Sequence, residues 1–153
     1  MPKYSEKTLN NRKEALAEAL LEIEKCRKTK SKTLEIGYNG YLTVFPEEIR
    51  ELTWLTSLLV VCTDISEIPD WIDELKDLKV IDFSTNKRLR KLPPSLVNLK
   101  YLKKLVIDNT GLKSLPLFLG EMHSLEYIEI GPYNLKTIPQ SILDLPKLKR
   151  IET

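Results

Sequence analysis

The stretch "LRKLPPSLVNLKYLKKLVIDNTGLKSLP", residues 89–116, contains one full period of a pattern that runs through most of the chain. A proline after an apolar residue opens each period, and apolar residues follow it at steps of three and then at a step of two. The opening prolines are Pro46, Pro69, Pro93, Pro116 and Pro139, so successive periods are 23, 24, 23 and 23 residues long. A fixed period of this length indicates an array of structural repeats.

The apolar positions agree from unit to unit. Counted from each proline, they are Ile49, Ile72, Leu96, Leu119 and Ile142 at three; Leu52, Leu75, Leu99, Met122 and Leu145 at six; Leu55, Leu78, Leu102, Leu125 and Leu148 at nine; Leu58, Ile81, Leu105, Ile128 and Ile151 at twelve; and Val60, Phe83, Ile107 and Ile130 at fourteen. Steps of three favour a short 3₁₀ or helical segment with one buried stripe. The step of two predicts a strand. Because one unit cannot bury its apolar face alone, we expect the units to stack around a shared core.

The motif "LPxxLxxLxxLxxLxLxxNxL", which residues 34–153 follow nearly throughout, resembles the leucine-rich repeat of about 23 residues. The resemblance implies an α/β fold: a right-handed solenoid with a concave parallel sheet and short 3₁₀ or helical convex segments. The motif's asparagine, which would satisfy backbone groups of the loop, is present as Asn39 and Asn86. Thr63, Thr110 and Tyr133 replace it elsewhere; threonine can still hydrogen-bond, whereas Tyr133 after a proline suggests an altered loop.

The segment "ALAEALLEIEKCRKTKSKTLEIGYNGYLTVFPEEI", residues 15–49, is similar to the start of leucine-rich repeat segments in bacterial proteins, including those attached to Roco-type GTPases. Residues 11–28 are predicted to form a helix that caps the array, since Asn11 and Glu14 have capping-box spacing. Its expected apolar face, lying on the strand "TLEIG" (33–37), consists of Leu16, Leu20, Ile23 and Cys26. We therefore expect one structural domain: a tail and capping helix in 1–32, and one strand unit with about five repeats in 33–153.

Composition excludes several classes of protein. The 24 basic and 22 acidic residues nearly balance, which argues against a dedicated polyanion binder. Neither a signal-peptide apolar region nor a membrane-spanning apolar run occurs in the sequence. Two cysteines are too few for a disulfide framework. We expect a soluble protein in the cytoplasm.

Catalytic and metal-binding patterns are missing from the sequence. It has one histidine, His123, and contains neither a glycine-rich phosphate loop nor a Gly-x-Ser-x-Gly turn. Cys26 and Cys62 lack metal-ligand spacing; Cys26 is interpreted as a packing residue, and Cys62 falls near the concave rim. Trp54 and Trp71 fall on convex positions and are expected to cover the core. We predict no enzymatic activity, cofactor, metal or small-molecule substrate.

The concave face is the surface where we expect binding. Its central column, between the two apolar residues of each strand, consists of Glu35, Leu59, Asp82, Val106, Glu129 and Glu152. Adding neighbours on the same face gives the candidate site: Glu35, Tyr38, Leu59, Val80, Asp82, Ser84, Lys104, Val106, Asp108, Tyr127, Glu129 and Glu152. Solvent-facing aliphatic side chains among acidic ones indicate an interaction surface. The alternative is that these are ordinary strand residues, which would suit β-branched Val80 and Val106.

The leading hypothesis is a non-enzymatic protein–protein interaction module, such as a regulator, effector or inhibitor, whose partner has a basic or apolar surface. One alternative is self-assembly or docking through an uncapped carboxyl-terminal edge, "LKRIET" (148–153); the oligomeric state is left open. Another is weak binding of nucleic acid or another polyanion by the basic loop, which consists of Lys87, Arg88, Arg90 and Lys91. This loop carries the extra residue of the 24-residue period, and we interpret it as solvated surface or a rim of the concave site.

Overall fold

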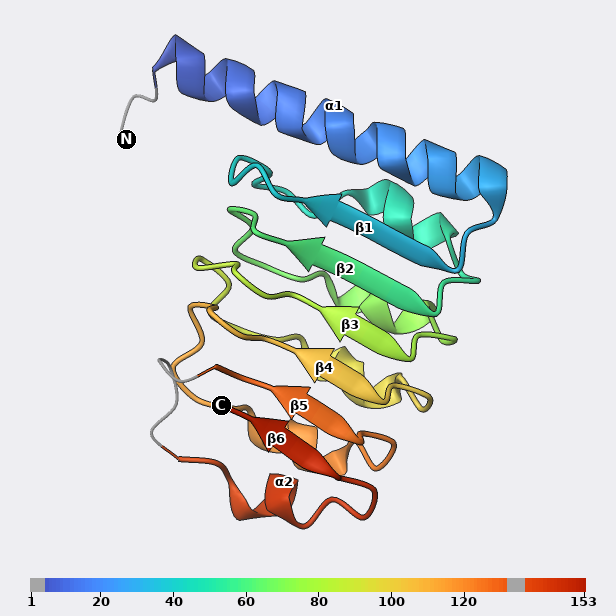
Figure 1. The fold of residues 1–153 in the computed structure, drawn as a ribbon, viewed down its shortest axis with the longest axis vertical. Helices are drawn as coiled ribbons and strands as arrows, with labels where there is room; N and C mark the ends of the chain where they lie inside the picture. Colours follow the sequence, from blue (N-terminus) through green and yellow to red (C-terminus); the bar gives the residue numbers. More distant parts are fainter. Residues whose placement is uncertain (1–4, 132–136) are drawn as a thin grey trace.

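The computed structural model describes residues 5–131 and 137–153 and shows one long helix followed by six parallel strands (Figure 1). Helix α1 spans Glu6–Thr29, and the strands are β1 (Thr33–Gly37), β2 (Ser57–Val61), β3 (Val80–Asp82), β4 (Lys104–Val106), β5 (Tyr127–Glu129) and β6 (Arg150–Glu152). They pair in sequence order, each with the next. On the opposite side lie the 3₁₀ helices η1 (Glu47–Glu51), η2 (Asp70–Glu74), η3 (Pro94–Asn98) and η4 (Leu117–Glu121) and the short helix α2 (Gln140–Leu143).

The steps of three in the sequence correspond to i→i+3 hydrogen bonds between the apolar positions themselves. In one unit, the backbone N–H of Leu96 donates to the carbonyl of Pro93 (3.2 Å). In the same way Leu99 donates to Leu96 (3.1 Å), and Leu102 donates to Leu99 (3.1 Å). Proline suits the start of this segment because its φ is already near the required value (−71° at Pro93) and its missing N–H is not needed there. The convex segments therefore form where the sequence predicts them.

The core is a continuous stack of the repeat positions. All the apolar positions at three, six, nine, twelve and fourteen residues after the prolines are buried, except that Leu148 and Ile151 of the last unit are only partly buried. Burial of a leucine or isoleucine contributes roughly 1.5–3 kcal/mol, so this stack is the main source of stability. The predicted parallel sheet, convex segments and shared core are confirmed.

The beginning of α1 differs from the prediction. The helix starts at Glu6, and its N-cap is Ser5, whose Oγ accepts a hydrogen bond from the Thr8 N–H (3.2 Å). The predicted cap at Asn11 is wrong, since Asn11 lies inside the helix. A serine followed by an acidic residue in the first turn is the stronger start signal, because the side chain caps an unpaired N–H and the carboxylate complements the helix dipole.

The buried face of α1 also differs. It consists of Ala15, Ala19, Ile23 and Cys26, while Leu16 is exposed and Leu20 is only partly buried. The predicted burial of Ile23 and Cys26 is confirmed, and the predicted burial of Leu16 is wrong. Small alanine side chains on the inner face let the helix lie close to β1, which displaces the longer leucines from the contact. Within residues 5–131 and 137–153, no helix is both long and apolar enough to cross a membrane.

Candidate functional site

The strand register places the predicted central column in one row across the sheet. Glu35 pairs in register with Leu59, Leu59 with Asp82, and the row continues through Val106 and Glu129 to Glu152. A second row contains Thr33, Ser57, Val80, Lys104, Tyr127 and Arg150. The candidate residues on the strands therefore do lie together on one face.

The half of this face formed by β1–β3 carries acidic groups without cationic partners. Among the described residues, no lysine, arginine or histidine forms an ion pair with Glu35 or Asp82. The Tyr38 hydroxyl donates a hydrogen bond to the Glu35 carboxylate. That bond is the main cause of the raised pKa of Tyr38, and partial burial and the charges of Glu35 and Asp82 add to it. Partly exposed Leu59 and Val80 lie between these polar groups.

In the half formed by β4–β6, glutamate carboxylates pair with lysine and arginine side chains. Lys104 Nζ lies 3.3 Å from Glu129 Oε2, and Arg150 Nε lies 2.9 Å from Glu152 Oε1. Just before β5, Glu126 pairs with both Lys149 and Lys103. Hydrogen bonds from these two lysines, Lys149 first, lower the pKa of Glu126. Glu126, Glu129 and Glu152 thus each have a cationic partner in this half.

Val106 corrects one part of the sequence-based interpretation. It lies in the central row, but only 5% of it is exposed. Its short side chain lies between Asp82 and Glu129 of the neighbouring strands. It is therefore unavailable as an apolar contact, unlike Leu59 and Val80. Tyr38 (62% exposed) and Tyr127 are open to solvent, and Ser84 and Asp108 are partly exposed just after their strands.

A left-handed turn recurs after strands β1–β4, and the repeat pattern does not predict it. Tyr38, Cys62, Thr85 and Asn109 all have φ between 51° and 66°. The chain leaves each strand at this point, and backbone bonds such as Thr85 N–H to Asp108 C=O (2.9 Å) join successive turns. Only asparagine among these residue types commonly adopts this conformation, so the residue types could not reveal it. Cys62 is one of these turn residues, with an intermediate exposure.

The predicted asparagine role, which is to satisfy backbone groups of the loop, holds fully at Asn86 and only in part at Asn39. Asn86 is fully buried, and its side chain bonds to the backbone of Val60 in β2, of Phe83 just after β3, and of Thr63 in the preceding loop. Asn39 instead donates to Glu18 of α1 (3.0 Å) and accepts from the Tyr41 N–H (3.1 Å). Thr110 donates to the Ile107 carbonyl (2.9 Å). Tyr133 lies outside the described residues.

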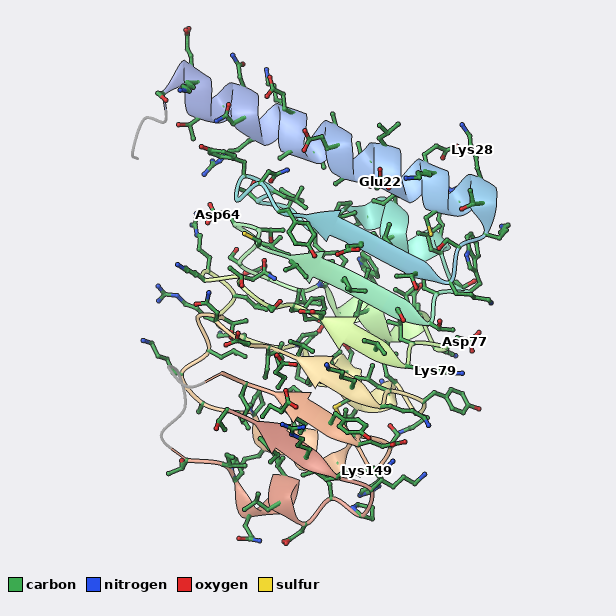
Figure 2. All side chains as sticks on the ribbon, in the orientation of Figure 1. Glu22, Lys28, Asp64, Asp77, Lys79 and Lys149 are labelled. Carbon is green, nitrogen blue, oxygen red and sulfur yellow. The ribbon has the colours of Figure 1, made fainter. Side chains whose placement is uncertain are left out.

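The basic loop is exposed on the side where the chain leaves the strands. Arg88 pairs with Asp64 of the preceding loop (3.0 Å), and Arg12 of α1 lies 3.8 Å from the same carboxylate. Figure 2 shows Asp64 at this side of the molecule. Part of the loop's charge is therefore used to join neighbouring segments.

The remaining residues singled out in the sequence have packing or surface positions. Trp54 and Trp71 are partly buried against the core, where Trp54 Nε1 donates to Ser31 (3.0 Å) and Trp71 meets Phe45 edge to face at 5.6 Å. Burial raises the pKa of the Cys26 thiol. His123 is exposed. Across the described part of the chain, histidine, cysteine and carboxylate side chains form no group of three or more that could hold a metal ion.

Comparison with solved structures finds related repeat domains. The leucine-rich repeat domain of the type III effector XopL matches with a TM-score of 0.62 and 28% identity, over 71% of this chain and 37% of that one. The plant peptide hormone receptor RGFR1, in complex with RGF2, matches with a TM-score of 0.61 and 25% identity. The match covers 85% of this chain and 25% of the receptor chain. The Arabidopsis receptor kinase HAESA, in complex with the peptide hormone IDA and the co-receptor SERK1, matches with a TM-score of 0.62 and 22% identity. The match covers 78% of this chain and 21% of the matched chain. The chain thus spans 21–37% of the length of these proteins.

Comparison with curated protein sequences finds no match. The family model described as a leucine-rich repeat region matches residues 20–153, which include the carboxyl-terminal part of α1 and the whole sheet. Together with the repeat period, the six-stranded parallel sheet and the Asn86 bonds, this match shows that the chain belongs to the leucine-rich repeat family.

Proposed function

We propose that the protein binds a protein partner through the acidic concave surface, which we define as Glu35, Tyr38, Leu59, Val80 and Asp82. The observation that carries the proposal is the contrast between the two halves of the sheet: acids without cationic partners beside partly exposed aliphatic side chains on β1–β3, and glutamates paired with cations on β4–β6. Leucine-rich repeat domains commonly mediate protein–protein interactions, and RGFR1 was solved with the peptide RGF2. The proposal assigns binding, without catalysis, to this chain.

Recognition on this surface would combine charge and apolar burial. Uncompensated carboxylates attract a partner with lysine or arginine side chains and orient it during encounter. Leu59 and Val80 then lose contact with water when apolar groups of the partner cover them. The surface lies on hydrogen-bonded strands, so little conformational entropy is lost when the partner binds. The partner we expect is therefore a basic segment with neighbouring apolar side chains.

Two single substitutions test the surface. Asp82→Lys is expected to reduce partner capture at least ten-fold, because it replaces attraction by repulsion, and Leu59→Ser at least three-fold, because it removes apolar contact. Capture is measured by quantitative mass spectrometry of proteins retained from the native host by immobilised wild type and variants. The relevant proteins are those retained by the wild type.

Each substitution has a matched control elsewhere on the molecule. Asp77→Lys makes the same charge change in an exposed turn before β3, at the opposite end of the strands (Figure 2). Leu117→Ser makes the same apolar change in η4, on the convex side, where Leu117 is 73% exposed. Both controls should retain the partner at the wild-type level. Equal losses with the controls and the concave variants would contradict the proposal.

A further inference from the structure

Strand β1 has an outer edge with unused backbone groups. Among the described strands, β1 pairs only with β2, and the even-numbered residues on either side of it bond toward β2: the Tyr38 N–H donates to the Val61 carbonyl (2.9 Å), and the Lys32 carbonyl accepts from the Ser57 N–H (3.0 Å). Because backbone groups alternate between the two edges of a strand, Glu35 directs its N–H and C=O away from β2, toward α1. No group in the described part of the chain bonds them across that edge.

The neighbouring edge residue shows that this edge is otherwise satisfied. Thr33 donates its N–H to Ser31 Oγ (3.2 Å), and its carbonyl accepts from Ser31 Oγ (2.7 Å) and from Cys26 Sγ (3.8 Å). Two residues further along the strand, α1 supplies no such partner for the N–H and C=O of Glu35. The open groups are thus limited to the part of β1 that follows Thr33.

A groove lies between α1 and β1 beside these open groups. It has a volume of about 730 Å³ and is lined by one side of α1 and by residues 31–39. Its buried lining is apolar and includes Ala19, Leu34 and Ile36, and Leu21, 67% exposed, also lines it. A volume in this range accommodates a ligand of drug size, and therefore a short peptide segment. We call it the edge groove.

The charge of the edge groove is negative. Glu18, Glu22 and Glu35 line it together with one cation, Lys25, whose ammonium lies 3.2 Å from Glu22. Figure 2 labels Glu22 on α1, above β1. The groove therefore offers apolar surface, a free strand edge and net negative charge in one place.

We propose that the edge groove binds an extended segment of a partner protein that carries alternating basic and apolar side chains. The segment adds a strand to the sheet at Glu35, donating to its C=O and accepting from its N–H. Its basic side chains lie beside Glu18 and Glu35, and its apolar ones contact Leu21. A second copy of this chain fits poorly, because β1 pairing with β1 about Glu35 would bring two identical carboxylates together. The edge groove shares Glu35 and Tyr38 with the acidic concave surface, but its other lining residues come from α1 and from residues 31–39 and do not include Leu59, Val80 or Asp82.

The test uses a defined probe, the capped peptide Lys-Val-Lys-Val-Lys, titrated into ¹⁵N-labelled protein and followed by NMR. We expect shift changes at Glu35, Gly37 and the groove side of α1, and at least ten-fold slower hydrogen exchange of the Glu35 amide at saturation. The same peptide N-methylated at its three central residues should bind at least ten-fold more weakly, because it cannot donate to a strand edge. The capped peptide Glu-Val-Glu-Val-Glu should also bind at least ten-fold more weakly, because the groove is negatively charged.

Protein variants locate the probe. Glu18→Lys should weaken binding at least three-fold, while the same charge change at exposed Glu121, outside the groove, should leave the affinity unchanged. Asp82→Lys should also leave it unchanged, which separates this site from the concave surface. The proposal is overturned by absence of binding at millimolar peptide, by equal affinity of the N-methylated peptide, or by binding without protection of the Glu35 amide. Protection that grows with protein concentration alone would indicate a second copy and would likewise overturn it.

Discussion

Asn86→Leu is expected to lower the midpoint of thermal unfolding by about 10 °C, a loss of about 3–5 kcal/mol. Asn86 Nδ2 donates to the carbonyls of Val60 and Phe83, both at 2.7 Å, and its Oδ1 accepts from the Thr63 N–H at 3.1 Å. Leucine has the same number and branching of side-chain heavy atoms, but it is bulkier and makes none of these bonds. Three backbone groups would lose their side-chain partner in a fully buried site, at about 1–3 kcal/mol each and not fully additively.

The location of Asn86 explains why the effect should concentrate at one interface. Its side chain joins the β2 unit to the β3 unit, and in a repeat array each unit depends on its immediate neighbours. Hydrogen exchange should therefore accelerate first in β2, β3 and the loops that follow them. The control is Asn98→Leu, at an exposed asparagine on η3 that donates to Asp73 (2.8 Å). Its expected cost is about 0.5 kcal/mol or less. Equal midpoints for the two variants would contradict the role assigned to Asn86.

The stacked core was predictable because its positions are set by backbone geometry. Steps of three match the i→i+3 bonds of the convex segments, and the step of two matches the pleat of the strands. Any side chain at those positions faces the interior, so the apolar pattern alone identified the core and the rows on the concave face. The row from Glu35 to Glu152 followed directly from this register.

What the sequence did not reveal depends on side-chain size and on contacts across many residues. The repeat pattern does not extend to α1, where the contact distance to β1 selected Ala15 and Ala19 over the larger Leu16. The ion pair between β4 and β5 depends on which rotamers Lys104 and Glu129 adopt across the two strands. The edge groove depends on how closely α1 approaches β1, which residue types do not encode individually.

Ile23→Asp is expected to detach α1 from the array, at a cost of about 3–5 kcal/mol. Ile23 is 1% exposed at the centre of the helix face that packs on β1. An aspartate there would be a buried charge without a partner, since the neighbouring face consists of Ala19, Cys26 and the apolar side chains of β1. The helix can avoid this cost by separating from β1.

Detachment should be visible as a local change before the array unfolds. Trp54 bonds to the Ser31 carbonyl at the end of α1 and lies 3.7 Å beneath the Lys30 ammonium, so its fluorescence should shift toward that of exposed tryptophan. Amides of α1 and β1 should lose protection from exchange, whereas those of β3–β5 keep it. Leu21→Asp makes the same type of change on the same helix at an exposed position, and should leave α1 attached. If Ile23→Asp retained wild-type protection in α1, contacts other than this apolar face would have to hold the helix on the sheet; if it removed protection from all strands together, the array would depend on its cap for folding.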